Sequence, residues 1–566
     1  MRWIIKDKVD ADKINHISKA LDIDHILATL LVQRGIDNFD KAKHFFRPNL
    51  NDLHDPYLMT DMEKAVSRIE LAITREENIM IYGDYDVDGT TAVSLVYDYL
   101  RSYYDNVATY IPDRYAEGYG VSYKGIDFAS DNEFSLIIAL DCGIKAVDKV
   151  SYASEKGIDF IICDHHRPGN HLPEAVAVLD PKRTDCNYPY DELCGCGIGF
   201  KLIQALSQKR DQTIDDLNPY LDLVATAIAA DIVPLTGENR TLTYFGLKVI
   251  NSNPRPGIKA MMLQTKKAVF DITDVVFKLA PRINAAGRIE HGLYAVNLLT
   301  EKNYETAETY AEAINAYNIQ RKDLDQNITQ EALDQIIEQK EENHSATVVF
   351  NDAWHKGVIG IVASRLIEKY YRPTLVFTKS GDKLAASARS VKGFDIYNAL
   401  EQCTDFIEQF GGHKYAAGLT LEPEKYLPFK QKFLEVVTET MPKEFLIRQI
   451  IIDATIFLSD ITPKFQRILN QLGPFGPQNM KPVFMSSGLR DNGYGKRIGD
   501  NGDHLKLNII SGSDKRTYNA IGFGLGNKYD LISNGKCFKA VFTIEENHWN
   551  GMTSLQLNIK DLLEDA

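Results

Sequence analysis

The sequence predicts an α/β protein with a parallel-sheet domain, a long connecting helix, a second, smaller α/β domain and a C-terminal β-barrel. Three patterns carry this prediction. From residue 51 to 303, short apolar runs alternate with stretches of helical periodicity, which is typical of an α/β domain wound around a parallel sheet. Residues 304–345 are rich in Ala, Glu, Gln, Lys and Asp and contain neither Gly nor Pro, as expected of long helices. Beyond residue 444, short alternating strands are separated by Gly- and Asn-rich turns, as in a small barrel.

The length of the chain sets the expected number of domains. With 566 residues the chain is too long for one hydrophobic core, and three or four domains are expected. The first 50 residues look helical and are expected to pack on the first large domain. The predicted segments are an N-terminal helical region (1–50), the parallel-sheet domain (51–303), the connecting helix (304–345), the smaller α/β domain (346–443) and the barrel (444–566).

Composition argues against two classes of protein. The longest apolar stretch, Leu221–Leu235, is interrupted by Asp222 and Asp231 and is too short to span a bilayer. No signal-peptide core follows Met1, so a cytoplasmic location without a membrane is expected. The seven cysteines are scattered, and their odd number argues against a disulfide framework.

The net charge of −14 is unevenly distributed along the chain. Residues 448–566 carry 14 Lys and Arg against 12 Asp and Glu, so the acidic excess lies entirely in the preceding residues. Because local patches decide nucleic-acid binding, global acidity does not exclude a basic groove.

Three apolar runs end in acidic residues, and the third also ends in two histidines. Continuous apolar runs of this length are typical of buried parallel strands, whose carboxyl ends meet at one edge of a sheet. So many like charges cannot lie together without cations, and a mixture of carboxylate and imidazole suits Mn²⁺ or Mg²⁺. The runs and their ends are Ile79–Tyr82 before Asp84, Asp86 and Asp88, Leu136–Leu140 before Asp141, and Phe160–Cys163 before Asp164, His165 and His166.

Two further observations extend this predicted metal cluster. Asp231 interrupts an otherwise apolar helix, where a lone buried carboxylate is costly unless it is paired or binds a metal. His165 and His166 are adjacent, so their side chains should diverge. One is expected to bind metal, and the other to support a ligand or face the substrate.

Two alternative metal sites are weaker. The segment Asp84–Gly89 superficially resembles the start of an EF-hand loop, but a strand precedes it and no acid is placed for the last ligand. Cys194-Gly195-Cys196 could suggest zinc, but no second thiol pair follows it, so these are expected to be turn and core residues.

Together these motifs resemble the DHH phosphoesterase superfamily, named for its Asp-His-His. Further motifs downstream resemble, within that superfamily, the RecJ family of single-strand-specific 5′→3′ DNA exonucleases, and the resemblance covers the chain from about residue 50. One departure is Asp180-Pro181, where Asn-Pro is expected. The motifs are GDYDVDG (83–89), ALDCG (139–143), ICDHH (162–166), AIAADIVPL (227–235), PRINAAGR (281–288), ASARS (386–390), FGGH (410–413) and LGPFG (472–476).

The resemblance implies a DHH-type catalytic domain, a DHHA1-type substrate-binding domain and an OB-like barrel. It implies two Mn²⁺ or Mg²⁺ ions, with Asp141 as the bridging ligand. His166 would face the scissile phosphate as a donor or proton shuttle and, with Asp141 and Asp86, is the expected catalytic group. The implied metal ligands are Asp84, Asp86, Asp88, Asp141, His165 and Asp231.

The resemblance also assigns substrate contacts. Ser387 and Arg389 occupy alternate positions of one strand and resemble the group that holds a terminal 5′-phosphate. Gly411, Gly412 and His413 would let backbone amides and a ring nitrogen approach the same anion. Arg282 and Arg288 would bind backbone phosphates, and Arg114 would guide the strand at the entrance. Candidates in the barrel are Tyr494, Lys496, Arg497, Lys506 and Trp549.

The expected function is therefore a metal-dependent nuclease (a hydrolase) that releases mononucleotides from the 5′ end of single-stranded DNA in DNA repair and recombination. A single-strand-binding protein and a RecQ-type helicase are expected helpers, and a monomer is expected. The alternatives are a DHH phosphodiesterase for short oligoribonucleotides or cyclic dinucleotides, a soluble pyrophosphatase, and an inactive scaffold that binds nucleic acid. The long C-terminal extension argues against the first two, and the competent residues at every ligand position argue against the third.

Overall fold

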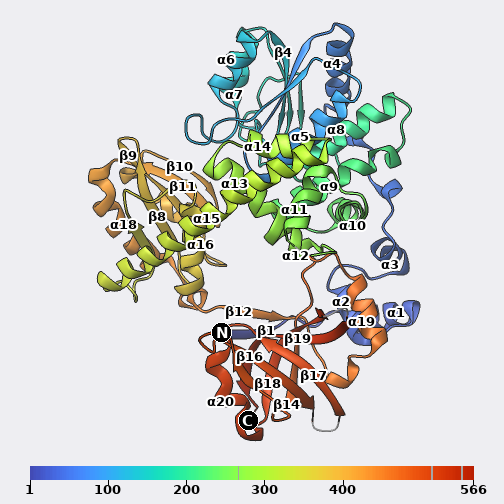
Figure 1. Cartoon of the computed structure of the whole chain (residues 1–566), viewed down its shortest axis with the longest axis vertical. Helices are drawn as coiled ribbons and strands as arrows, with labels where there is room; N and C mark the ends of the chain where they lie inside the picture. Colours follow the sequence, from blue (N-terminus) through green and yellow to red (C-terminus); the bar gives the residue numbers. More distant parts are fainter. Residues whose placement is uncertain (266, 512–513, 550–551, 566) are drawn as a thin grey trace. The chain divides into compact units, whose positions relative to one another are not determined.

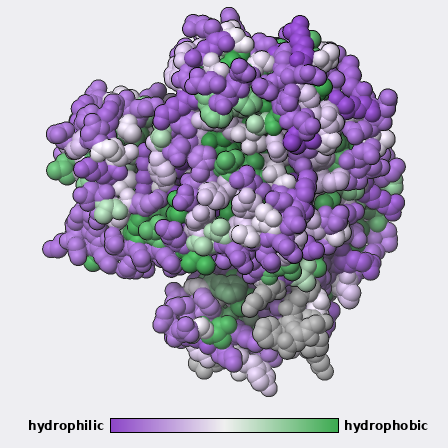
Figure 2. Space-filling model, turned by 45° about the horizontal axis from the view of Figure 1, so that its top comes forward, coloured by the Kyte–Doolittle hydropathy of each residue, from purple (hydrophilic) through white to green (hydrophobic). Residues whose placement is uncertain are grey.

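The computed structural model of the chain describes residues 1–265, 267–511, 514–549 and 552–565. The chain forms two compact units. The smaller unit comprises residues 1–53, 234–244 and 449–566, and the larger unit comprises 54–233 and 245–448. Figure 1 colours both units along the sequence, and Figure 2 shows a face that is covered largely by hydrophilic side chains.

The larger unit begins with the predicted parallel sheet. Five strands in the order β3-β2-β4-β5-β6 are all parallel, and their central residues are buried because helices pack on the sheet. Helices α6 and α7 share a core with strands β2, β4 and β5, whereas α5, α8 and α9 pack against one another (Figure 1). The bounds are α4 Met62–Thr74, β2 Asn78–Gly83, α5 Val87–Arg101, β3 Val107–Tyr110, α6 Tyr123–Asp131, β4 Phe134–Leu140, α7 Val147–Glu155, β5 Asp159–Cys163, β6 Ala177–Leu179, α8 Gly195–Lys209 and α9 Leu221–Asp231.

A helical segment leads from this sheet to the second α/β domain. Its last helix, α15, spans Tyr304–Glu338 without interruption. The first half of α15 packs on α11, α13 and α14, and its second half packs on α16 and β7. The preceding helices are α10 Gly237–Ser252, α11 Pro256–Gln264, α12 Ile272–Asp274, α13 Ala280–Ile289 and α14 Leu293–Thr300, with a π-helical turn at Val275–Leu279.

The second α/β domain contains a mixed sheet in the order β10-β11-β9-β8-β7. Only β7 and β8 pair in parallel, and the other pairs are antiparallel. The bounds are β7 Thr347–Phe350, α16 Ile359–Lys369, β8 Thr374–Ser380, β9 Lys383–Arg389, α17 Ile396–Glu401, β10 Gln409–His413, β11 Ala416–Leu421 and α18 Tyr426–Thr440.

The smaller unit contains the predicted barrel. The strand order β14-β18-β19-β17-β16 is closed by a pairing of β14 with β16, which gives a ring of five strands. The bounds are β12 Gln449–Ile452, β13 Ala454–Thr455, α19 Pro463–Gln471, β14 Phe484–Asp491, β15 Lys496–Ile498, β16 His504–Ser511, β17 Asp514–Gly522, α20 Tyr529–Ile532, β18 Phe538–Trp549 and β19 Met552–Glu564.

The expectation that residues 1–50 pack on the first large domain is wrong. Buried residues of this segment, including Ile17 and Leu27, share one core with barrel residues such as Phe484 and Leu557. The first strand, β1 (Arg2–Ile5), also pairs in parallel with β12. An amphipathic helix encodes an apolar face but not the surface that covers it, so the sequence pattern could not choose between the domains. The helices are α1 Ala11–Leu21, α2 His25–Val32 and α3 Phe39–Phe46.

Within the described ranges, no helix has both the length and the apolar character that crossing a membrane requires.

Candidate metal centre

The carboxyl ends of three adjacent parallel strands bring the predicted acids together. Asp84 directly follows β2, and Asp141 directly follows β4. His165 is the second residue after β5. Asp86 caps the N-terminus of α5, and Asp231 ends α9. Asp141 lies in the left-handed region, with φ of 59°, a conformation that Asp tolerates better than most residues and that turns its side chain at the strand end.

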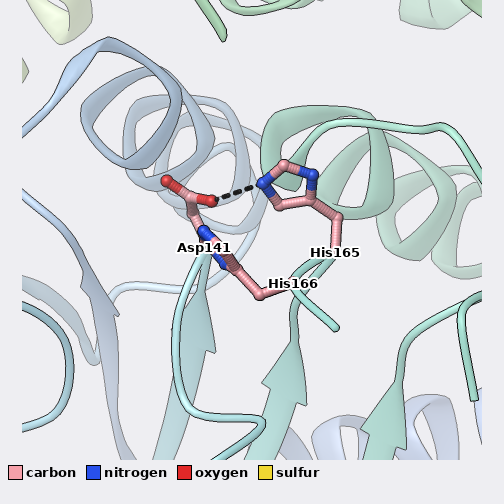
Figure 3. A group of neighbouring side chains, drawn as sticks. All are labelled: Asp141, His165 and His166. Atoms are coloured by element: carbon pink, nitrogen blue, oxygen red, sulfur yellow. Dashed lines mark ion pairs between the residues drawn. The ribbon is translucent and has the colours of Figure 1, made fainter. Parts of the chain in front are cut away.

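His165 lies at the centre of this group. Its Nε2 atom is 3.2 Å from Asp141 Oδ1, 3.6 Å from Asp231 Oδ2 and 3.8 Å from Asp88 Oδ2 (Figure 3 shows Asp141 and the two histidines). Two sets of potential ligand atoms lie within 4.8 Å of one another: Asp141 with His165 and His166, and Asp88 with His165 and Asp231. Each set is a candidate metal site, and the two sets share His165.

Backbone amides hold the carboxylates in place. Asp84 accepts from the amides of Tyr85 at 2.6 Å and Gly120 at 2.7 Å. Asp88 accepts from Gly195 at 2.6 Å and Cys196 at 2.8 Å, the first two residues of α8. A helix N-terminus stabilises a negative charge, so α8 favours ionised Asp88.

Gly195 and Cys196 are site residues that the sequence analysis missed. It took Cys194-Gly195-Cys196 for ordinary turn and core residues. A Cβ atom on Gly195 would lie 2.5 Å from the Asp141 Cβ, so only glycine fits between the two aspartates. The available signal was a glycine between two small residues at the start of an apolar helix.

The electrostatics of the group favour a bound cation. Burial, followed by the charges of neighbouring acids, raises the pKa of Asp84 to about 8, of Asp231 to about 8 and of Asp88 to about 6. The same causes raise the pKa of Asp141 well above its ordinary value. Asp141 Oδ1 and His165 Nε2 are buried and have no hydrogen-bond partner in the described part of the chain. Hard oxygen ligands with one imidazole fit Mn²⁺ or Mg²⁺.

The expectation that the two adjacent histidine side chains diverge is wrong, because their ring centroids lie 4.6 Å apart, although His166 has its own hydrogen-bond partner. Its Nδ1 lies 2.8 Å from Asp164 Oδ1, which also accepts the amides of both histidines. Burial opposes protonation of His166, but the hydrogen bond to Asp164 outweighs it and raises the pKa of His166 to about 9. The side chain of His166 is 32% exposed. Asp164, which was not among the predicted site residues, fixes the orientation of His166 and raises its pKa.

The edge of the sheet carries two more groups that the sequence analysis did not assign. Lys182 donates from Nζ to the His165 carbonyl at 2.6 Å. Asp180, which stands where Asn is expected, is fully buried and accepts the Lys182 amide at 2.7 Å. Burial raises the pKa of Asp180 to about 7, so Asp180 is substantially protonated near neutrality and then resembles the neutral Asn.

Three of the predicted phosphate-binding arginines lie near one another. The Arg114 guanidinium stacks 4.0 Å above the Tyr85 ring and donates to the Gly287 carbonyl. Burial, followed by the charges of Arg114 and Arg389, lowers the pKa of Arg288 to about 9. Arg282 instead donates to the Lys278 carbonyl at 2.5 Å and to Asn315 at 3.2 Å.

The second domain presents Ser387, Arg389, Gly411 and His413 on one sheet face, whereas Gly412 pairs with Ala417 at the alternate position. In the register of β9, β11 and β10, Ser387 lies beside Gly418, which lies beside Gly411. Arg389 lies in the same way beside Ala416, which lies beside His413. Gly and Ala between the polar groups leave the face open to an anion. Burial, followed by the charge of His166, lowers the pKa of His413, and both histidines belong to the larger unit.

The barrel candidates are only partly described. Tyr494 is exposed, and Lys496 lies opposite Lys506 in the β15–β16 pair. Arg497 lies 5.4 Å from the centroid of the Tyr529 ring. The Trp549 side chain lies outside the described residues, and the binding roles of all five candidates stay predictions.

Comparison with known protein families gives the class of protein that the fold and the site define. The model of the DHH family N-terminal domain matches residues 78–228, that of the DHHA1 domain matches 340–441, and that of the RecJ OB domain matches 452–561. The protein is thus a DHH-superfamily phosphoesterase with the DHHA1 and OB domains that the sequence predicts.

Individual relatives narrow this class to a family. The chain is 37% identical to the single-stranded-DNA-specific exonuclease RecJ of Bacillus subtilis, over 99% of this chain and 70% of the relative. It is 32% identical to the RecJ of Salmonella typhimurium, over 96% of both chains. The crystal structure of Thermus thermophilus RecJ in complex with Mn²⁺ has the same fold, with a TM-score of 0.86 and 24% identity over 100% of this chain and 80% of that one. The chain belongs to the RecJ family.

Proposed function

We propose that this protein is a metal-dependent exonuclease that degrades single-stranded DNA from its 5′ end and releases 5′-mononucleotides during DNA repair and recombination. Two features of the larger unit support the proposal: the metal centre, and the sheet face that carries Ser387, Arg389 and His413. A phosphate held on that face would place the next phosphodiester bond at the metal centre. Membership of the RecJ family supports the same substrate.

Six residues would hold the metal ions in this proposal: Asp84, Asp86, Asp88, Asp141, His165 and Asp231. Asp141, whose Oδ1 has no other partner among the described residues, would serve both ions. Two divalent cations would lower the pKa of a water molecule and offset the charge on the attacked phosphate. The T. thermophilus relative of the same fold binds Mn²⁺.

His166 donates a proton to the leaving oxygen in this proposal. Its hydrogen bond to Asp164 keeps Nδ1 occupied and the ring protonated near neutral pH, so Nε2 carries a proton that it can donate. Asp164, with a pKa lowered to about 2, does not compete for that proton: burial alone would raise this pKa, but the hydrogen bond and charge of His166 outweigh it.

Substrate recognition divides between terminal and internal phosphates. The terminal 5′-phosphate would be bound by Ser387, Arg389 and the Gly411–His413 strand. Arg288 and Arg282 would contact internal phosphates, and Arg114, stacked on Tyr85, would guide the strand. The barrel would bind the same strand further from the metals.

The expected biological setting is carried over from the family resemblance. We infer a monomer that works in the cytoplasm with a single-strand-binding protein and a RecQ-type helicase, which would supply unwound strands.

The direct test uses single-stranded DNA of about 30 nucleotides, labelled at the 5′ or the 3′ end, with blunt duplex controls. With Mn²⁺ or Mg²⁺, the label at the 5′ end should appear at once as a mononucleotide, whereas the 3′ label should stay on progressively shorter strands. The duplex should persist, and a chelator should stop the reaction. Survival of the long strands with cleavage of di- to pentanucleotides or cyclic dinucleotides would instead establish the short-substrate phosphodiesterase.

A further inference from the structure

Helix α16 of the second domain is held from two directions by the rest of the larger unit. At its start, Arg288 of α13 donates to the Gly357 carbonyl at 2.9 Å, two residues before the helix begins. The Arg288 carbonyl in turn accepts from the Tyr115 hydroxyl. These contacts tie the beginning of α16 to the domain that carries the metal centre.

A second tie lies at the midpoint of α15. Asp325 is fully buried, and its Oδ2 accepts from Arg321 at 2.9 Å. Its Oδ1 forms an ion pair with Arg365 of α16, 2.6 Å from Nη2, but accepts no hydrogen bond from the described residues. Arg321 also donates from Nη2 to Asn318 Oδ1 at 2.5 Å. One buried carboxylate therefore joins two arginines from different helices, which we call the Asp325 clasp.

The Asp325 clasp lies at the middle of α15, between the two regions of the helix that pack on different domains. Arg321 is the central residue of this 35-residue helix. Before it, Ala307, Ala311 and Ile314 are buried in the half that packs on α11, α13 and α14. After it, Ile328 and Ala332 belong to the core shared with α16 and β7. Figure 1 shows α15 running from α11 and α13 to α16. The clasp sits where α15 passes from one domain to the other.

Helix α16 in turn supports the face that we assign to the 5′-phosphate. A Cβ atom on Gly360 would lie 2.9 Å from Arg389 Nη2 and 3.4 Å from Ser387 Oγ. The two polar groups therefore rest directly on the first turn of α16. Arg365 lies five residues further along, about 7.5 Å by helical rise. A shift of α16 would move Arg389 and Ser387 with it.

We propose that Asp325 is a positioning residue that, through Arg321 and Arg365, fixes α16 and so sets the distance from the 5′-phosphate face to the metal centre. The proposal rests on the function proposed above, because it assigns the Ser387–Arg389 pair to the terminal phosphate. Such a distance matters, since a displacement of about 1 Å can cost roughly 100-fold in rate.

The test compares two variants that open the clasp with one matched control. Arg365→Gln removes the ion pair between α15 and α16 at a side chain that is 36% exposed. The hydrogen bond from Arg321 to Asp325 is left in place. Asp325→Asn removes the shared charge. Asp334→Asn makes the same substitution at an exposed position of α15, where Asp334 accepts from Gln330 at 2.8 Å.

Two readouts are needed, and one is independent of activity. Hydrogen exchange of the full chain should show faster exchange of α16 and β9 amides in Arg365→Gln and Asp325→Asn, with α5 and β4 unchanged. The ratio of kcat/KM for 5′-phosphorylated over 5′-hydroxyl single strands should fall on the order of tenfold or more. Mn²⁺ affinity should stay at the wild-type value, and Asp334→Asn should match wild type in every measurement.

Each other outcome is decisive. Unchanged exchange in α16 and β9 would overturn the clasp, whatever the activity. Faster exchange with an unchanged preference for the 5′-phosphate would overturn the positioning role. If Asp325→Asn does not fold, Arg365→Gln decides alone. A wild type that degrades no strands would refute the proposed function, while hydrogen exchange would still decide whether Asp325 fixes α16.

Discussion

Asp141 Oδ1 faces His165 Nε2 at 3.2 Å, and neither atom has a hydrogen-bond partner among the residues described. A buried acceptor without a donor is costly, and here it lies among other acids with raised pKa values. These atoms therefore lower the stability of the metal-free protein and become favourable only when a cation shares them. The same two atoms account both for this loss of stability and for the affinity of the site for metal.

Asp141→Asn separates these two effects. The variant keeps the shape of the side chain but removes the charge, so exonuclease activity should fall at least about 1,000-fold, because several kcal/mol of metal-derived stabilisation are lost and each 1.36 kcal/mol is tenfold. In chelator, its melting temperature should rise, because burial and neighbouring acids raise the pKa of Asp141 and Asn removes the cost of protonating that carboxyl on folding. Single-turnover kinetics measure the fall in activity, and calorimetry on the same preparation measures the rise in melting temperature. A metal-free variant less stable than wild type would contradict this reading of Asp141.

The acids also predict how metal-free stability depends on pH. A group whose pKa rises on folding stabilises the folded state below its unfolded pKa, and this contribution disappears as pH rises through the folded pKa. For Asp84 and Asp231 the folded pKa is about 8, so stability should fall between about pH 6.5 and 8. His166, raised to about 9, acts in the same direction. His165, lowered to about 3, acts oppositely, but only below about pH 6.5.

Melting temperatures in chelator at pH 6.5 and pH 8 measure this slope. Saturating Mn²⁺ should flatten it, since bound cations keep the carboxylates ionised at both pH values. The double variant Asp84→Asn/Asp231→Asn should make the slope shallower without metal, and His166 should account for part of what is left. A metal-free wild type whose melting temperature is constant or rises over this range would show that these acids are not protonated on folding.

At the scale of elements, the sequence predicts which strands end in acidic residues. It does not predict which backbone amides bind the carboxylates of those residues. The apolar runs before Asp84, Asp141 and Asp164 predicted parallel strands, and the sheet confirms the fold. The amides of Gly195 and Cys196, which hold Asp88, come from a helix more than 100 residues away in the chain. Local periodicity contains no information about which helix start meets which strand end, so this support appeared only in the structure.

The N-terminus of α8 is the element on which Asp88 and Asp141 depend. In Gly195→Ala, the added Cβ would lie 2.5 Å from the Asp141 Cβ and must displace it. Mn²⁺ affinity should drop about 10- to 100-fold, as is typical when the support of a ligand is lost. Titration calorimetry measures this affinity. Gly197→Ala, whose Cβ would have ordinary contacts of 3.4 Å or more in the same helical turn, is the matched control. Equal Mn²⁺ affinities in both variants would show that the N-terminus of α8 does not support the metal ligands.

In the proposed function, the sheet face formed by β9, β10 and β11 is responsible for the preference for a 5′-phosphate. Arg389→Gln should reduce kcat/KM for 5′-phosphorylated strands by about 1.5–3 kcal/mol, or roughly 10- to 150-fold, because charge-assisted hydrogen bonds are lost. Strands with a 5′-hydroxyl should be affected much less. Paired kinetics on the two substrates give the answer. An equal loss on both would assign Arg389 to internal phosphates or to folding.

For the whole molecule, the order of the domains along the chain could be predicted from the sequence. Which segments of the chain fold together into each unit could not. The parallel sheet, the second α/β domain and the barrel follow one another as their patterns indicate. The smaller unit, however, gathers residues from both ends of the chain and from 234–244. Ile17 and Leu27 are compatible with any apolar surface, so only the folded chain shows that they complete the core of the barrel.

Truncation after Arg448 tests this shared core. Without the barrel, the buried faces of α1 and α2 lose their partners, including Phe484 and Leu557. The truncated chain should therefore bind a hydrophobic dye and exchange amides rapidly in residues 1–53, while the sheet that carries the metal centre stays protected. Protection of residues 1–53 equal to that in the full chain would show that they fold without the barrel.

The most direct test of the metal centre is a crystal structure of the full chain with Mn²⁺, measured at the manganese absorption edge. The account predicts two anomalous peaks per chain, both among Asp84, Asp86, Asp88, Asp141, His165 and Asp231, with Asp141 touching both ions. The Asp141→Asn crystal should lose at least one peak. A single ion in the wild type, or ions bound away from these six residues, would contradict the two-metal centre on which the proposed nuclease depends.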